Sequence, residues 1–249
     1  HGDTWGFING RAAWQKKNFV YGNADVWADD FKSGSDHYAA NNLPAGFGGV
    51  DSVVIGYIAS HGVTSGSTFT MSAGGTGHGG CTVKSTQMSF GQNDLRYMFS
   101  STCQSVRNVN PGAVWFRTAK GIRAIFGYHT NIVDSDAYGK YFFENWKKTG
   151  AKTTDSFLDA SWRVSHDQSP VAAWFGPNTA AAEGFRDNEE YFQLDAVSGN
   201  SIAWSWYDAR TLDRELQLPT GAIVTLEFNA PRGPEAAAEL ISQLSSGQP

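Results

Sequence analysis

A chain of 249 residues, of which 41% are hydrophobic and 17% charged, has the composition of an ordinary globular protein with a core of its own. The formal net charge of −5 gives no electrostatic reason to expect a nucleic acid or an anionic membrane as a partner. No apolar run approaches the roughly 18 to 20 residues of a bilayer span, and no signal peptide precedes His1, so we expect a soluble, processed chain.

The composition also favours secretion, because glycine and aromatic residues are abundant and lysines are few. The two cysteines, Cys81 and Cys103, permit either one disulfide bond in an oxidising compartment or two free thiols. Their spacing does not decide between these states.

The first half of the chain predicts a strand near residues 18–21 and a short helix over residues 23–32, where Trp27 and Phe31 are four apart. Residues 52–60 form a nearly continuous apolar run, which predicts a strand buried on both faces in a parallel sheet. A hairpin is expected to follow, with residues 67–71 as one arm, the glycine-rich loop 74–80, and residues 82–90 as the other arm.

Further along, residues 95–101 and 122–128 predict two more buried strands, joined by a helix that opens at Asn110 and closes at Gly121. This is a βαβ unit, which in nearly all proteins has a right-handed crossover. Helices are predicted over residues 136–149 and 154–165, an irregular stretch over 165–187, strands at 191–194, 202–206 and 222–228, and a tail helix from Pro231. We find no internal repeat and no linker.

Two of the buried strands end on residues with useful chemistry. His61 directly follows the first strand, and Cys103 ends the second in a run of small residues. In open parallel sheets, catalytic groups gather at the carboxyl ends of the strands. A thiol near an imidazole can lose its proton at ordinary pH and act as a nucleophile in acyl transfer. Backbone N–H groups of Gly62 and Cys103 could then stabilise an oxyanion.

Several segments together resemble a known family. They are VWADDF (residues 26–31), VDSVVIGYIASHG (50–62), LRYMFSSTCQS (95–105), GIRAIFGYHT (121–130) and the following DSDAYGKYF helix. Their order and spacing are similar to the caspase-like fold of clan CD cysteine peptidases, which includes caspases, legumain, gingipains and clostripain. More closely, they resemble a poorly characterised family of secreted bacterial caspase-like proteins. The resemblance spans about residues 23–162. It implies that Cys103 is the nucleophile, His61 its imidazole partner, and Gly62 and Cys103 the oxyanion site.

Substrate preference does not follow from the resemblance, because the small and polar neighbours of Cys103 differ from the charged residues common in that family. As substrate-binding residues we name Ser101, beside the cysteine, and His129, at the end of the third strand. Asp134 and Asp136 follow that strand and would favour Arg or Lys before the cleaved bond. An Asp-Ser-Asp run at a helix start is also commonly a cap.

Other interpretations of the same residues stay open. If Cys81 and Cys103 form a disulfide, the nucleophile does not exist, and a non-catalytic domain that binds carbohydrate or protein is the alternative. His78 lies in the glycine-rich loop and is expected to be exposed. His1 resembles the copper-chelating terminus of lytic polysaccharide monooxygenases, but nothing else here matches that family.

Nucleotide and zinc sites are not supported. The loop 74–80 lacks the GK[ST] of a phosphate loop, and the cysteines and histidines lack zinc-ligand spacing. Among the tryptophans, Trp115, Trp146 and Trp162 fall at helical core positions, whereas Trp204 and Trp206 could form an exposed platform.

The sequence therefore predicts one α/β domain over residues 1–249, with a core at about 23–230 and a tail helix at 231–249. Its expected architecture is a caspase-like three-layer α/β/α sandwich with a mostly parallel central sheet and extra C-terminal strands. The expected activity is that of a secreted, monomeric cysteine endopeptidase that acts on peptides or proteins, without a cofactor or a metal and without a nucleic-acid or membrane partner.

Overall fold

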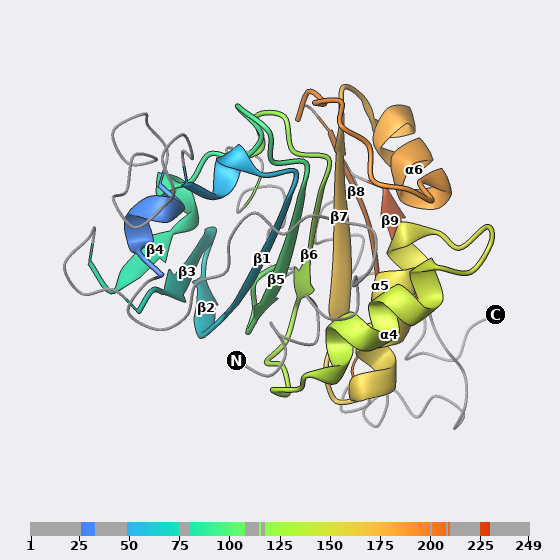
Figure 1. The fold of residues 1–249 in the computed structure, drawn as a ribbon, viewed down its shortest axis with the longest axis horizontal. Helices are drawn as coiled ribbons and strands as arrows, with labels where there is room; N and C mark the ends of the chain where they lie inside the picture. Colours follow the sequence, from blue (N-terminus) through green and yellow to red (C-terminus); the bar gives the residue numbers. More distant parts are fainter. Residues whose placement is uncertain are drawn as a thin grey trace, which may run out of the picture.

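The computed structural model describes residues 26–32, 49–74, 80–107, 115, 118–199, 201–207 and 209, and for residues 225–229 it describes the backbone alone. Six strands form the main sheet, in the order β1-β5-β6-β7-β8-β9 (Figure 1). The strands are β1 (Ile55–Ser60), β5 (Tyr97–Thr102), β6 (Ala124–Tyr128), β7 (Pro170–Gly176), β8 (Ser201–Tyr207) and β9 (Thr225–Asn229). The strands expected at β1, β5, β6, β8 and β9 are confirmed, whereas β7 was not expected.

The main sheet is mixed, so the expectation of a mostly parallel sheet is wrong. β5 runs parallel to β1 and β6, but every pair from β6 to β9 is antiparallel. The reason lies between β6 and β7, where α4 (Ala137–Trp146) and α5 (Thr153–Val164) pack on each other as a helical hairpin. Two helices return the chain to the edge where β6 ended, and Pro170 consequently pairs with Tyr128.

The segment expected to be irregular, residues 165–187, instead contains β7 and α6 (Thr179–Asn188). β7 is buried along its whole length, so it lacks the alternation that marks a half-exposed strand. Pro170 is its first residue, one of the few strand positions that tolerate proline. Asn178 then starts α6, because its side-chain oxygen accepts a hydrogen bond from the Ala181 N–H at 2.9 Å.

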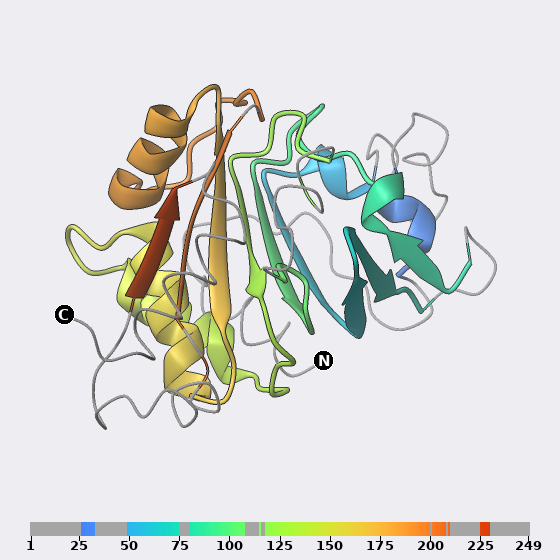
Figure 2. The ribbon, with the colours of Figure 1, turned by 180° about the vertical axis from the view of Figure 1, so that it is seen from behind.

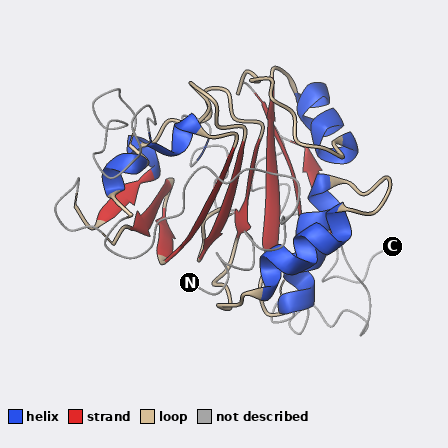
Figure 3. Ribbon diagram, viewed as in Figure 1, coloured by secondary structure: helices blue, strands red, loops and turns tan. Residues whose placement is uncertain are grey.

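One face of the main sheet carries an aromatic core that the helices cover. Figures 1 to 3 show these helices together at the β7–β9 end of the sheet. Phe99 of β5 stacks on Phe126 of β6 with ring centroids 4.5 Å apart, and its ring also meets Phe142 of α4 and Phe157 of α5. The amphipathic spacing of α4 and α5 places these rings towards the sheet, as expected. α6 lies beside α5, where the Thr154 hydroxyl donates to the Arg186 carbonyl at 2.7 Å.

A separate antiparallel sheet in the order β2-β3-β4 comes between β1 and β5 in the sequence and lies beside β1 (Figure 1). Its buried side chains share one hydrophobic cluster with those on the opposite face of the main sheet. Its strands are β2 (Gly62–Ser65), β3 (Thr68–Ser72) and β4 (Thr82–Lys84). The expected hairpin is thus confirmed as β3 and β4, while β2 was not expected. Phe69 and Trp115 pack against each other on this side, with ring centroids 5.5 Å apart. Among the described residues, the only long helices pack on the other face, so the second helical layer of a three-layer sandwich is not seen.

Some sequence predictions fall elsewhere. The strand at 18–21, most of the helix at 110–121, and the tail from Pro231 lie outside the described residues. Of the helix expected over 23–32, the described part, residues 26–32, contains only a short 3-10 helix, η2 (Ala28–Asp30). Residues 191–194 are not a strand, and β1 is only half-buried because it ends the order of described strands. None of the helices in the described segments has the length and apolar composition that a membrane crossing requires.

Candidate active site

His61 and Cys103 lie at the same edge of the main sheet, where the parallel strands β1 and β5 end. The last register pair of β1 and β5 is Ser60 with Thr102, so each candidate residue comes directly after a paired position. Neighbouring strands lie about 4.8 Å apart, which brings the two backbones close together. The His61 side chain is exposed, and Cys103 is half-buried and a free thiol.

Cys103 sits on a tight turn. The Ser105 N–H donates to the Thr102 carbonyl at 3.3 Å, which closes the turn around Cys103 and Gln104. Gln104 has φ of 55°, and no other non-glycine residue among those described has a positive φ. This left-handed conformation costs a residue with a Cβ about 1 to 2 kcal/mol. The Cys103 thiol meets the chain after β6, where the Ile132 N–H donates to Sγ at 3.5 Å.

Gln104 holds the turn through bonds to the elements on both sides of it. Its side-chain oxygen accepts from the Thr64 N–H of β2 at 3.1 Å, and its carbonyl accepts from the Thr64 hydroxyl at 2.7 Å. On the other side, its N–H donates to the Thr130 carbonyl at 2.9 Å and its side-chain amide to Asn131 Oδ1 at 3.2 Å. Arg107 donates to the same side-chain oxygen at 3.0 Å. The strained residue is therefore fixed by the fold, as strained residues at functional sites often are.

The direction of the Gly62 amide follows from the pairing of β2. The Ser72 N–H donates to the His61 carbonyl, whereas the Thr64 N–H points outward to Gln104. Backbone groups alternate along an antiparallel pair. The Gly62 N–H therefore points, like that of Thr64, away from β3 and towards the turn that follows β5.

Gly62 is also where β2 touches that turn. A Cβ on residue 62 would lie 2.4 Å from Thr102 Cγ2 and 2.9 Å from the Cys103 carbonyl oxygen. The Phe69 ring would be only 2.7 Å away. Only glycine fits here, so the small sheet approaches the candidate nucleophile as closely as a backbone allows.

His129 follows β6, the strand on the far side of β5 from His61. Its N–H donates to the Ser169 carbonyl at 2.9 Å. Burial, together with the positive charge of Arg107, lowers the pKa of His129 to about 4. The imidazole is consequently neutral at pH 7. This places His129 next to the strand of Cys103 as a polar, uncharged group.

Ser101 is buried and lines a small cavity of about 20 Å³, whose wall includes Tyr57, Tyr128, Tyr138 and Ser161. A cavity of this size holds about one water molecule. Its lining consists of rings, hydroxyls and small side chains, without a charged group. The position under the Cys103 turn thus accepts only a small, uncharged group in this conformation.

Asp134 and Asp136 are both exposed, and neither lines the cavity of Ser101. Asp136 is the N-cap residue of α4, but its side chain makes no capping bond. The Ala137 N–H instead donates to Ser135 Oγ at 3.2 Å. The two acids are therefore exposed and close in sequence to Val133, which is itself 48% exposed.

A scan against protein families places the chain. The model described as Domain of unknown function (DUF6345) matches residues 3–208. The chain belongs to this family. No curated protein and no solved structure matches it. In this DUF6345 chain, the candidate active site falls within the matched residues.

The other candidates can now be placed. Cys81 is an exposed free thiol, so the disulfide with Cys103 that the alternative function requires is absent. Trp204 and Trp206 are buried in the sheet, 8% and 7% exposed, so the expected aromatic platform is wrong. His1 and His78 lie outside the described residues. Within the described segments, no three His, Cys, Asp or Glu side chains are grouped as metal ligands.

Sequence reasoning missed Gln168, which orders the chain after β6. Gln168 is fully buried, and its Oε1 accepts from the Val133 N–H at 3.2 Å and from the Tyr138 hydroxyl at 2.7 Å. Its amide donates to the Ser161 carbonyl at 2.7 Å. Gln168 thereby fixes the segment that presents the Ile132 N–H to Cys103. A lone glutamine in a polar stretch carries no signal of this role.

Proposed function

We propose that the protein is a cysteine endopeptidase of the caspase-like type, with Cys103 as nucleophile and His61 as its acid–base partner. One observation carries the proposal. A free thiol and an imidazole-bearing residue end neighbouring parallel strands, and the Gly62 amide points to the same edge. The Ile132 N–H supports it further, because its bond to Sγ holds the Cys103 side chain at this edge.

The proposed reaction uses only groups of this chain. The Cys103 thiolate attacks the peptide carbonyl carbon, and the resulting oxyanion accepts hydrogen bonds from the Gly62 and Cys103 N–H groups. The C–N bond then breaks, and the His61 imidazolium gives its proton to the leaving amine. Water, deprotonated by His61, attacks the thioester, releases the acid and restores the thiol. No cofactor is needed for these steps.

The surroundings of Cys103 suit an extended peptide. Val63 of β2 and Val133 after β6 are 52% and 48% exposed, so each offers an apolar contact to a substrate side chain. Asp134 and Asp136 lie beyond Val133, where they would attract a basic side chain of the substrate. Under this proposal the protein is a secreted monomer whose partner is a peptide or protein substrate, and neither nucleic acid nor membrane takes part.

The test compares the two cysteines. Purified full chain is incubated with a library of fluorogenic peptides, and hydrolysis is followed for Cys103→Ala and for Cys81→Ala as the matched control. We expect Cys103→Ala to abolish hydrolysis and Cys81→Ala to leave it unchanged. Hydrolysis that survives in folded Cys103→Ala would disprove the assignment.

The alternative, a non-catalytic binding domain with a Cys81–Cys103 disulfide, makes a different prediction for the native thiols. The structure leaves both thiols free, so titration with a thiol reagent under native conditions should give two. A count of zero would favour the alternative.

A further inference from the structure

Residues 131–133 pass beside the Cys103 thiol, and they belong to no helix or strand. These three residues are called the strap below. The Ile132 N–H donates to Cys103 Sγ at 3.5 Å, and Cys103 is half-buried. A reacting atom has to come within about 3 to 3.5 Å of the sulfur. The Ile132 nitrogen is therefore already as close to the sulfur as a reactant would be, and it occupies one side of it.

On one side of Ile132, the strap is attached to the Cys103 turn through Asn131. The Gln104 side-chain amide donates to Asn131 Oδ1 at 3.2 Å. The Gln104 N–H donates to the carbonyl of Thr130, the residue before the strap, at 2.9 Å. The Thr130 hydroxyl in turn donates to the Asn131 carbonyl at 3.0 Å. The start of the strap is thus held against the turn that carries Cys103.

On the other side of Ile132, the strap is attached to buried side chains through Val133. The Val133 N–H donates to Gln168 Oε1 at 3.2 Å. The Tyr138 hydroxyl lies 2.8 Å from the Val133 carbonyl oxygen and 2.7 Å from Gln168 Oε1, so its one proton is shared between these two acceptors. Tyr138 is buried, and Gln168 is completely so. Both backbone polar groups of Val133 are consequently bonded to side chains rather than to a neighbouring strand.

Little apolar burial holds the strap in place. Asn131 and Val133 are exposed, and the partly buried Ile132 alone packs against the aromatic core that the helices cover. Segments with few buried apolar contacts open locally at a small cost in free energy. The side-chain bonds at Asn131 and Val133 therefore decide how often the strap opens.

We propose that the strap covers Cys103 and that its release controls access to the sulfur. For a reactant to reach Sγ, the bonds at Asn131 and Val133 break, and the Ile132 N–H leaves the sulfur. This inference concerns access alone and holds for any reaction of Cys103. It goes beyond the peptidase proposal and does not rest on it.

Alkylation of the native full chain with iodoacetamide tests the proposal. The reaction is stopped at intervals, and the Cys103 and Cys81 peptides are quantified by mass spectrometry, with exposed Cys81 as the internal reference. We expect the Cys103 rate to rise about 3- to 10-fold in Tyr138→Phe and about 2- to 5-fold in Asn131→Ala, while the Cys81 rate stays unchanged. A wild-type Cys103 rate in either variant would overturn the proposal.

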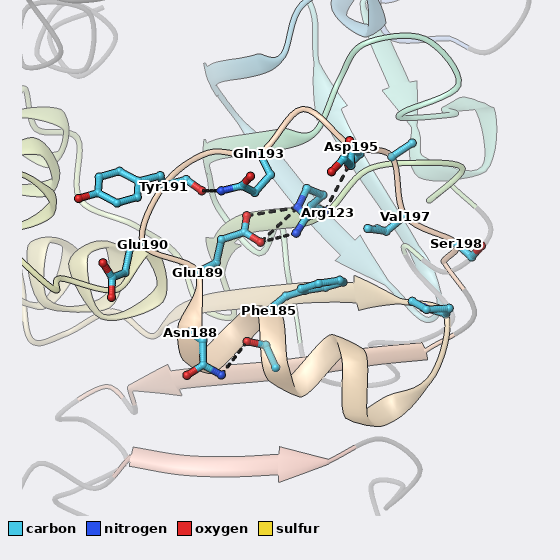
Figure 4. A pocket seen from close by; sticks show the side chains of 13 residues that line it. Arg123, Phe185, Asn188, Glu189, Glu190, Tyr191, Gln193, Asp195, Val197 and Ser198 are labelled. Carbon is cyan, nitrogen blue, oxygen red and sulfur yellow. Dashed lines mark hydrogen bonds and ion pairs between the residues drawn. The ribbon is translucent and has the colours of Figure 1, made fainter.

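Two matched controls separate release of the strap from a general loss of stability. Tyr128→Phe removes a hydroxyl that lines the same small cavity as Tyr138 but bonds Ser161 Oγ, at 3.0 Å. Tyr97→Phe removes a hydroxyl that bonds Glu189 at the other end of the sheet. There, Glu189 and Arg123 form a buried ion pair in the wall of a pocket of about 800 Å³ (Figure 4).

Both controls should keep the Cys103 rate within about twofold of wild type. A rise in either control as large as that in Tyr138→Phe would mean that general loosening exposes the thiol, and it would overturn the proposal. The readout needs no hydrolysis, so a failure of the peptidase proposal leaves this result intact.

Discussion

Replacing Gly62 with alanine tests whether the close approach of β2 to the Cys103 turn is needed for activity. The new Cβ would lie 2.4 Å from Thr102 Cγ2 and 2.9 Å from the Cys103 carbonyl. Ordinary carbon contacts are about 3.5 Å, so β2 or the turn must shift by about 1 Å. Overpacking of this kind costs about 1 to 3 kcal/mol of stability. A 1 Å displacement of reacting groups lowers catalysis about 100-fold.

The assay measures kcat/KM for peptide hydrolysis and the free energy of unfolding for Gly62→Ala beside Gly184→Ala. Gly184 is a fair control because it lies in α6 and a Cβ there meets nothing within 4 Å. We expect Gly184→Ala to keep full activity and to gain up to about 1 kcal/mol of helix stability. A folded Gly62→Ala protein with wild-type kcat/KM would refute the reasoning.

Three more predictions concern stability and the turn. Glu189→Gln should lower the free energy of unfolding by about 3 to 5 kcal/mol in urea, since it leaves the buried charge of Arg123 without a carboxylate, whereas half-exposed Glu190→Gln should lower it by less than about 1 kcal/mol. Equal losses would contradict this. Gln104→Ala should reduce kcat more than KM, because it loosens the turn rather than a substrate contact; a change in KM alone would count against it. The folded-state pKa of His129, about 4, lies below its ordinary 6.5, so the unfolded chain takes up the proton first. The contribution of neutral His129 is therefore fully present above pH 6.5 and is lost as the pH falls towards 4, by at most about 3 kcal/mol. His129→Gln should flatten the unfolding free energy over that interval, and an unchanged slope would show that other groups cause it.

The carboxyl edge of the parallel strands could be predicted because its signal is local. An apolar run that stops on His61 and another that stops on Cys103 mark two strand ends, and the structure pairs Ser60 with Thr102 just before them. The α4 and α5 helices were equally readable from aromatic spacing, and their bounds differ from the prediction by only a few residues. These features depend on residues close together in the sequence.

Features that depend on distant partners could not be predicted. The strand from Pro170 to Gly176 shows no alternation, because helices and the opposite core bury both of its faces. Trp204 and Trp206 alternate as an exposed platform would, but their side of β8 faces a core. Gln104 adopts a conformation that favours glycine, held by bonds to chain segments about 26 to 40 residues away. No local pattern announces such bonds.

The central claim is that Cys103 is the nucleophile, and covalent trapping tests it most directly. The native full chain is treated with a peptidyl chloromethyl ketone, and the adduct is mapped by peptide mass spectrometry. The account predicts one adduct, on the half-buried Cys103, although Cys81 is the more exposed thiol. An adduct on Cys81 alone, with Cys103 unmodified, would contradict it.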